Sequence, residues 1–122
     1  MHDESKKKRQ DANAQGAYAE ALAEQYLCDR GLNTITKNFR CKVGEIDLIM
    51  NDNECITFVE VKYRKSNAFG SAAESVTKAK QRKVKLAAQV FAQMHRQYSQ
   101  SPFRFDVLAI DGQEINWIQN AF

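Results

Sequence analysis

The chain has 122 residues, 43% of them hydrophobic, and carries a net charge of +3. This length accommodates one compact domain with its own core and excludes two domains of ordinary size. The small net charge does not by itself indicate a polyanionic partner, so the positions of the charged residues carry more information than their sum.

The apolar runs and the cysteines indicate a cytoplasmic protein. No apolar run approaches the roughly 18 residues that a membrane-spanning helix needs, and the N-terminus lacks the apolar stretch of a secretory signal. Cys28, Cys41 and Cys55 lie far apart, without a CxxC pair or a histidine at metal-ligand spacing. We therefore expect a reducing cytoplasmic location, with no membrane contact, zinc site or disulfide framework.

Residues 1–13 are polar and show no apolar periodicity. A segment without an apolar face cannot offset the entropy that folding costs. We expect a disordered tail here, followed by a single domain at residues 14–122. The basic run Lys6–Arg9 fits either a solvated tail or a contact with phosphates.

The segment Ala14–Arg30 has the spacing of an amphipathic helix, with apolar residues at every fourth position. These residues are Tyr18, Leu22 and Tyr26, with Ala19, Ala23 and Leu27 beside them. Gly31 is placed to end the helix as a C′ glycine. Glu20 lies near the apolar stripe, which fits either a border residue or an acid that serves a site.

The segment 32–64 contains three short runs rich in β-branched and aromatic residues, separated by turn-forming residues. The runs are TITKNFR at 34–40, EIDLIM at 45–50 and CITFVEVKYR at 55–64. They predict three strands in a meander. Both faces of the last run are largely apolar, as in an inner strand that is covered on both sides.

Glu60 and Lys62 are charged residues on an otherwise apolar face of that inner strand. Side chains alternate along a strand, so both share a face with Ile56 and Phe58. An ion on such a face costs several kcal/mol unless it is paired or bound to a metal. We infer that a partner or a ligand offsets this cost.

Asp47 adds a further acid in the neighbouring strand. By alternation Glu45 and Asp47 share a face with Ile49, whereas Ile46, Leu48 and Met50 line the other. A turn centred on residues 51–53 pairs position 47 with about position 57. Asp47 then reaches Glu60 through a bulge or a diagonal contact.

These residues fit two interpretations. Asp47, Glu60 and the backbone carbonyl of Val61 offer the hard oxygen ligands that Mg²⁺ accepts while it keeps several waters. Such a metal polarises a phosphodiester, and Lys62 is placed to stabilise the developing charge. The alternative is an internal Glu60–Lys62 ion pair, with Asp47 facing solvent.

A second helix is predicted at about Ser75–Tyr98, with Val84, Ala87 or Ala88, Phe91 and Met94 at helical spacing. Basic residues near its start favour phosphate contacts, and a solvated basic face is the alternative. The candidates for nucleic-acid contact are Arg64, Lys78, Lys80, Gln81, Arg82 and Lys85, with Lys83 among the same basic residues.

A closing hairpin is predicted after Pro102, which ends the second helix. Its strands are FRFDVLAI at 103–110 and EINWIQ at 114–119, joined at Asp111-Gly112. The predicted order is therefore helix, three strands, helix, two strands (αβββαββ), an α/β domain.

Four motifs together resemble the YraN family of uncharacterised bacterial proteins. They are GxxxE from Gly16 to Glu20, GEIDLI at 44–49, FVEVKYR at 58–64 and RFDV at 104–107. The likeness extends from about Gly16 to Phe122. That family is in turn similar to archaeal Holliday-junction resolvases and to the restriction-endonuclease-like, or PD-(D/E)xK, nucleases.

The resemblance implies a restriction-endonuclease-like core, with a mixed central sheet flanked by helices. It implies a divalent metal, Mg²⁺ or Mn²⁺, bound by Asp47 and Glu60. It also implies that Lys62 is the catalytic lysine, and that Glu20 matches an additional acid on the first helix that aids the metal or its water.

The function expected from these residues and this resemblance is metal-dependent endonuclease cleavage of DNA, including branched or otherwise structured DNA. Cutting both strands of a symmetric junction calls for two active sites, which favours a homodimer. One alternative is a non-catalytic nucleic-acid-binding module that recruits a partner enzyme. Another is an interaction domain whose buried charges fix the fold.

Overall fold

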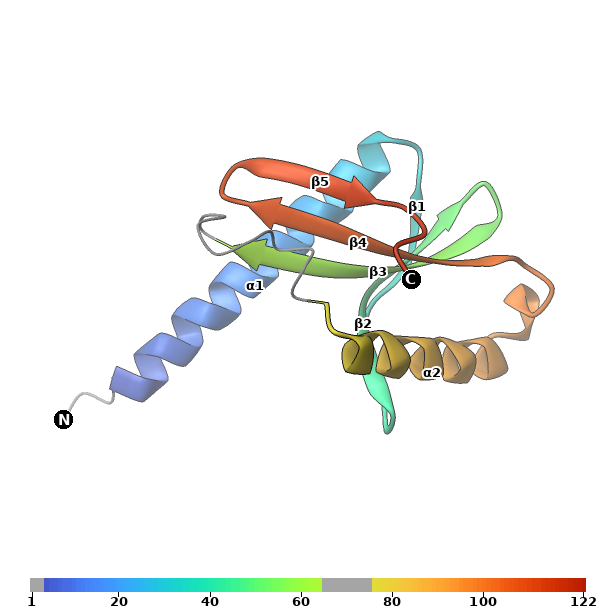
Figure 1. The fold of residues 1–122 in the computed structure, drawn as a ribbon, viewed down its shortest axis with the longest axis horizontal. Coiled ribbons are helices and arrows are strands. Elements are labelled where there is room, and N and C mark those ends of the chain that lie inside the picture. Colours follow the sequence, from blue (N-terminus) through green and yellow to red (C-terminus); the bar gives the residue numbers. More distant parts are fainter. Residues whose placement is uncertain (1–3, 65–75) are drawn as a thin grey trace.

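The computed structural model describes the backbone of residues 4–64 and 76–122, and side chains from residue 15 onward. The elements follow the order expected from the sequence, with a short 3-10 helix added after the second helix (Figure 1). They are α1 (Glu4–Asp29), β1 (Asn33–Cys41), β2 (Gly44–Asp52), β3 (Cys55–Arg64), α2 (Lys78–Met94), η2 (Arg96–Tyr98), β4 (Phe103–Asp111) and β5 (Glu114–Ile118).

The five strands form one mixed sheet in the order β1-β2-β3-β4-β5. Neighbouring strands are antiparallel except β3 and β4, which are parallel. A parallel pair needs a crossover connection, and α2 lies within it. The α/β class and the mixed sheet flanked by helices are therefore confirmed. Within the described ranges, no helix has both the length and the apolar character to span a membrane.

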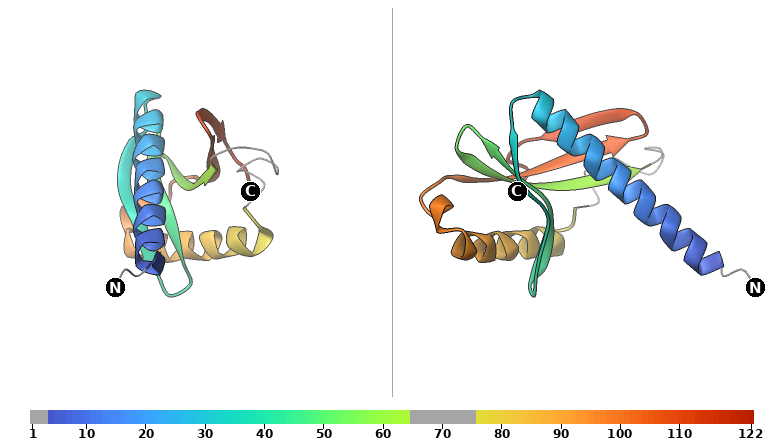
Figure 2. Two further views of the ribbon diagram at one scale, coloured as in Figure 1. Left: turned by 90° about the vertical axis from the view of Figure 1, so that its left-hand side faces the viewer. Right: turned by 180° about the vertical axis from the view of Figure 1, so that it is seen from behind.

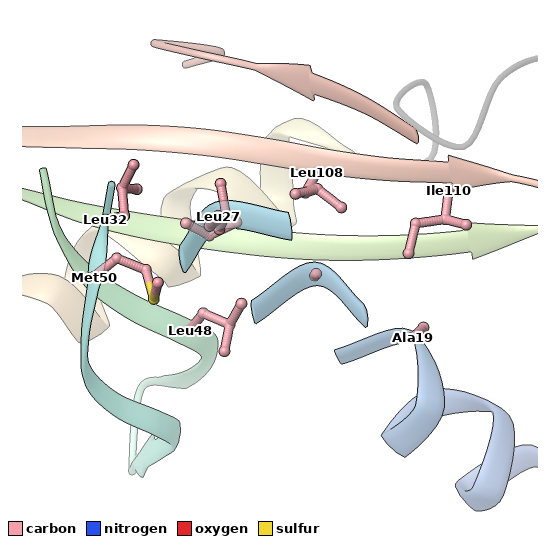
Figure 3. Close-up of a cluster of buried hydrophobic side chains, with 9 residues drawn as sticks. Ala19, Leu27, Leu32, Leu48, Met50, Leu108 and Ile110 are labelled. Atoms are coloured by element: carbon pink, nitrogen blue, oxygen red, sulfur yellow. The ribbon is translucent and has the colours of Figure 1, made fainter. Parts of the chain in front are cut away.

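Each helix covers a hydrophobic core on one face of the sheet. The core under α1 contains Ala19, Ala23, Leu27, Leu32, Leu48, Met50, Val59, Leu108 and Ile110 (Figure 3). The core under α2 contains Ile46, Ile49, Ile56, Phe58, Val84, Ala87, Ala88 and Phe91. Because β3 contributes to both cores, it is the inner strand that its sequence predicts.

Helix α1 ends as predicted but begins well before the expected start at Ala14. Gly31 adopts a φ of +94°, and its N–H donates to the Cys28 carbonyl while that of Leu32 donates to the Leu27 carbonyl. At the other end the helix begins at Glu4 and includes most of the segment for which we expected disorder. Residues 4–13 include Glu4, three lysines, Arg9, Gln10 and Ala12, residue types whose helix propensity does not depend on an apolar face.

The packed face of α1 is the Ala19, Ala23 and Leu27 side of the predicted stripe. Leu22 and Tyr26 lie half-buried at its border, whereas Tyr18 is 67% exposed. Small alanines let the helix approach the sheet closely, which moves the larger residues to the edge of the contact. The inclusion of Tyr18 in the buried stripe was therefore wrong.

Helix α2 is shorter than predicted. Its N-cap is Thr77, whose hydroxyl accepts a hydrogen bond from the Lys80 N–H, and the expected start at Ser75 lies outside the described residues. The helix stops at Met94 because His95 leaves helical geometry, with φ −130° and ψ 77°. Met94 holds the predicted helical spacing but is 64% exposed, so it lies outside the packed face of α2.

The β1–β2 hairpin bends towards α2, and its tip extends past that helix (Figures 1 and 2). Asn38 has a φ of 54°, a left-handed conformation that asparagine tolerates. Phe39 then packs edge-on against Phe91 of α2, with ring centroids 5.4 Å apart. Ile46 belongs to the core under α2 for the same reason, which corrects the prediction that it shares the face of Leu48 and Met50.

Candidate active site

The turn between β2 and β3 places Asp47 in line with Glu60. Asn53 and Glu54 have φ values of 49° and 71°, which is the two-residue type I′ turn. The ladder then runs from Asp52 paired with Cys55 to Leu48 paired with Val59. One further step along this register sets Asp47 opposite Glu60. The predicted pairing of position 47 with 57 was wrong, and no bulge is needed, because the turn lies later than residues 51–53.

The Asp47 carboxylate lies beyond the last backbone pair of the β2–β3 ladder. Its Oδ2 accepts a hydrogen bond of 2.8 Å from the Val61 N–H, in place of a backbone carbonyl. The N–H and C=O of one residue in an extended strand project towards the same neighbouring strand. The Val61 carbonyl therefore also faces β2, close to Asp47.

The Glu60 side chain is buried, with 1% of its surface exposed. Its Oε2 lies 3.7 Å from the Lys80 Nζ of α2, and its Oε1 has no hydrogen-bond partner among the described residues. Desolvation and the nearby Asp47 charge raise the pKa of Glu60 to about 7, while Lys80 and Lys62 act in the opposite direction. Glu60 is thus poised between its two protonation states at neutral pH.

Asp47 is also less acidic than an ordinary aspartic acid. Burial raises its pKa, and the charge of Glu45 adds to this effect. The Val61 hydrogen bond and the positive charges of Lys80 and Lys62 oppose it. The two acids therefore form a partly desolvated pair in which the charge of Asp47 disfavours ionisation of Glu60.

Lys62 lies two residues beyond Glu60 on β3 and is half-buried. Its charge lowers the pKa of both Asp47 and Glu60. The ion pair of Glu60, however, is with Lys80 from α2. A self-contained Glu60–Lys62 pair with Asp47 facing solvent therefore does not describe this arrangement, and Lys62 is left to act on both acids at longer range.

Glu20 of α1 interacts electrostatically with Asp47. Burial raises its pKa, followed by the charge of Asp47, whereas a hydrogen bond from the Asn38 side chain lowers it. Over residues 15–64 and 76–122, no three His, Cys, Asp or Glu side chains gather closely enough to hold a metal ion by themselves. Glu20 is thus an electrostatic neighbour of Asp47 and not the third member of a compact acid cluster.

A hard divalent cation fits the donors that are present. Two carboxylates and one carbonyl suffice for Mg²⁺, which keeps several of its own waters. The unpartnered Oε1 of Glu60 is a buried oxygen of the required type. The fit is therefore to Asp47, Glu60 and the Val61 carbonyl, with Glu20 nearby.

The predicted phosphate-contact residues separate into different environments. Lys78 and Arg82 are exposed on α2, and the Arg64 carbonyl accepts the Gly112 N–H. Gln81 donates its side-chain amide to the Val76 carbonyl. The Lys85 Nζ lies over the Phe105 and Phe122 rings, at 5.9 and 5.8 Å from their centroids. These residues do not form one surface.

Lys80 belongs to the acid site, which the sequence analysis did not anticipate. A signal for this position was present, because Lys80 precedes the buried Val84 by one helical turn and so lies on the inward face of α2. Arg40 and Lys42 of the β1–β2 tip were also missed, since only the bend of the hairpin brings them near α2.

The family model described as uncharacterised protein family UPF0102 matches residues 19–110. A UPF0102 protein of Saccharophagus degradans is 52% identical over 110 residues, which cover 90% of this chain and 93% of that protein. A UPF0102 protein of Vibrio campbellii is 54% identical over 109 residues, with coverages of 87% and 89%. One from Aeromonas hydrophila is 46% identical over 124 residues, with coverages of 100% and 95%.

Proposed function

This chain belongs to the uncharacterised protein family UPF0102, and we propose that it is a divalent-metal-dependent endonuclease that hydrolyses phosphodiester bonds in DNA. UPF0102 is the YraN family, so the family resemblance expected from the GEIDLI and FVEVKYR motifs is confirmed. The nuclease activity is our inference from the candidate active site. We assign Asp47, Glu60 and Lys62 to its centre, on a core of the restriction-endonuclease-like kind.

The observation that carries the proposal is the buried carboxylate of Glu60 beside Asp47. Its Oε1 is buried without a hydrogen-bond partner among the described residues, which costs about 1–3 kcal/mol or more for a charged group. An acid pair that served only stability would be satisfied on both oxygens. A site that binds a cation accounts for the unsatisfied oxygen and for the convergence of the two acids.

A bound Mg²⁺ or Mn²⁺ at this position would polarise the scissile phosphate and offset the charge that develops on it. The Val61 N–H donates to Asp47 Oδ2, which limits rotation of the carboxylate that would hold the metal. Lys62 presents its ammonium from the same strand as Glu60, where it stabilises negative charge on the phosphate. Glu20, with its raised pKa, is suited to take up a proton beside Asp47.

Lys80 favours ionisation of the acid pair. Its charge lowers the pKa of both Glu60 and Asp47, which favours the forms that bind a cation. Its position on α2 also ties the helix to the centre of the sheet, through the ion pair with Glu60. We assign it a positioning role.

The test is cleavage of linear, flapped and four-way DNA, with RNA duplex as a comparison, in Mg²⁺ and in Mn²⁺. Glu60→Ala and Lys62→Ala should each lower cleavage by at least about 100-fold, as expected when transition-state stabilisation is removed. Exposed Glu114 and Arg96 supply the control variants Glu114→Ala and Arg96→Ala, which should cleave normally. Activity that persists in both site variants would exclude this site. Salt-sensitive binding without cleavage in either metal would instead support a non-catalytic binding module.

A further inference from the structure

A basic pocket adjoins the acid pair, between the tip of the β1–β2 hairpin and α2. Its volume is about 420 Å³, and it is lined by Arg40, Cys41, Lys42, Val43, Gly44, Glu45, Lys80 and Lys83. We call it the hairpin pocket. Four cations and one carboxylate line it, so its field is positive, in contrast to the acid pair beside it.

We propose that the hairpin pocket binds the sugar–phosphate backbone of the nucleic-acid strand that enters the active site. The proposal rests on the proposed nuclease function for the identity of the ligand. The chemistry recognised is the phosphodiester anion, through lysine and arginine donors. The pocket therefore positions the strand and contributes affinity without reading its sequence.

The first support is the continuity between the pocket and the acid pair. Lys80 lines the pocket and also forms the ion pair with Glu60. Glu45 lines it as well, and it lies two residues before Asp47 on β2. A strand whose phosphates lie in the pocket is therefore led directly to the two acids.

The second support is that the pocket is built from two elements held at a fixed spacing. Gly44 begins β2 against α2, where an added Cβ would lie 3.0 Å from the Lys83 carbonyl oxygen and 3.3 Å from its Cβ. The lack of a side chain at Gly44 permits this close approach. Arg40 is oriented by Glu45, whose Oε2 lies 3.4 Å from the arginine Nε.

The third support is that the basic residues of α2 divide into those that line the pocket and those that do not. Lys78, Arg82 and Lys85 do not line the pocket, although they lie on the same helix. If the basic residues of α2 served only to keep the helix hydrated, all of them would be spread over its solvent-exposed face. Here Lys80 and Lys83, one turn apart, join Arg40 and Lys42 from another element to make a concave surface.

The experiment compares two triple variants of the full chain that remove equal charge. Arg40→Gln/Lys42→Gln/Lys83→Gln alters the pocket, and Lys78→Gln/Arg82→Gln/Lys85→Gln is the control. Binding of a fluorescent DNA duplex and a single strand is measured by anisotropy in EDTA, over a range of salt concentrations. Thermal unfolding confirms that both variants are folded, and the exposed ion pair of Arg40 with Glu45 contributes little to stability.

We expect the pocket variant to bind at least about tenfold more weakly at low salt, with a slope of log affinity against log salt reduced by roughly 2–3, since each phosphate contact contributes about 0.9. The control should keep most of the wild-type slope. Equal losses in both variants would assign binding to general surface charge and overturn the proposal, as would an unchanged pocket variant or a wild type that binds neither DNA.

This result is separable from the nuclease assignment. If the pocket variant loses binding while the wild type cleaves in neither metal, the pocket stands and the nuclease function fails. If Glu60→Ala abolishes cleavage while the pocket variant binds and cleaves as the wild type does, the active site stands and the pocket proposal fails.

Discussion

The Lys80 ammonium of α2 lies 3.7 Å from the buried Glu60 carboxylate of β3. This contact joins the crossover helix to the strand that precedes it. Even with Lys80 and Lys62 nearby, desolvation and the charge of Asp47 keep the pKa of Glu60 at about 7. Ionised Glu60 is therefore incompletely compensated by its two lysines for the loss of hydration, and a bound cation would favour its ionised form.

Lys80→Met removes one of the two positive charges that act on Glu60 while keeping a long apolar stem. We expect the pKa of Glu60 to rise above the wild-type value of about 7, because a favourable charge interaction with the ionised form is lost. The measurement is an NMR titration of the Glu60 carboxyl carbon. Lys83→Met, one turn further along α2, is the control and should leave the titration unchanged. An unaltered Glu60 titration in Lys80→Met would contradict the assigned ion pair.

The raised pKa of Glu60 makes the stability of the protein depend on pH when no divalent metal is present. Its pKa rises from an ordinary value of 4.5 to about 7 on folding, so the folded state holds the proton more tightly than the unfolded state. This contribution is fully present below pH 4.5 and is lost as the pH rises through about 7. Asp47, whose pKa is also raised, acts in the same direction.

Glu60→Gln mimics the protonated form at every pH. In EDTA, the melting temperature of Glu60→Gln should therefore rise relative to that of the wild type as the pH increases from 5 to 8. The expected change is several degrees, because each unit of the Glu60 pKa shift is worth about 1.4 kcal/mol. Differential scanning calorimetry measures this. A constant difference across that range would show that Glu60 does not titrate there. Added Mn²⁺ at pH 8 should raise the melting temperature of the wild type more than that of the variant.

Two substitutions of Asp47 separate its structural role from metal binding. Asp47→Asn keeps an oxygen that can accept the Val61 N–H, whereas Asp47→Ala leaves that donor without its partner. We expect the Asp47→Asn variant to be more stable than the Asp47→Ala variant by about 1–3 kcal/mol in urea unfolding, because an unsatisfied buried N–H is costly. Both should weaken Mn²⁺ binding by at least about tenfold in isothermal titration, since each removes a carboxylate ligand. Equal stability of the two variants would contradict the role assigned to the hydrogen bond.

The burial of Glu60 was predictable from the sequence because side chains alternate strictly along a strand. Glu60 and Lys62 interrupt an apolar face whatever the surroundings, and the type of each element follows from its periodicity. The pairing of Asp47 with Glu60 depended on the turn, which was misplaced because Asn51, Asp52 and Asn53 are all good turn residues. A shift of the turn by about one residue changes every partner along the two strands.

The partner of Lys80 could not be predicted from local sequence. Helical spacing places Lys80 on the inward face with Val84, but the direction in which α2 crosses the sheet decides that it meets Glu60. The bend at Asn38, which brings Ile46 and Arg40 towards α2, follows from a left-handed backbone that several asparagines in the chain were equally able to adopt. Tertiary packing selects among such positions, and the periodicity of the sequence carries no information about that packing.

Asp106 belongs to the RFDV motif, but its contacts lie outside the candidate active site. It is fully buried, and its carboxylate accepts hydrogen bonds from Arg104, the Trp117 Nε1 and the Asn120 N–H. Arg104 also pairs with Asp52, at 3.0 Å. This network ties β4 to the end of β2 and to the segment that follows β5. All the hydrogen-bond partners of Asp106 are structural ones.

Asp106→Asn should therefore destabilise the fold without changing the chemistry. We expect a loss of about 1–3 kcal/mol in urea unfolding, because asparagine has one oxygen where the two Asp106 oxygens accept several hydrogen bonds, while Arg104 keeps Asp52 as its counter-charge. Mn²⁺ affinity and the cleavage rate per folded molecule should stay within about twofold of the wild type, since Asp106 pairs with Val59 and so faces the opposite side of the sheet from Glu60. Arg96→Gln, an exposed change, serves as the stability control. If Asp106→Asn weakens metal binding without lowering stability, Asp106 is part of the metal site, and that site includes β4 as well as β2 and β3.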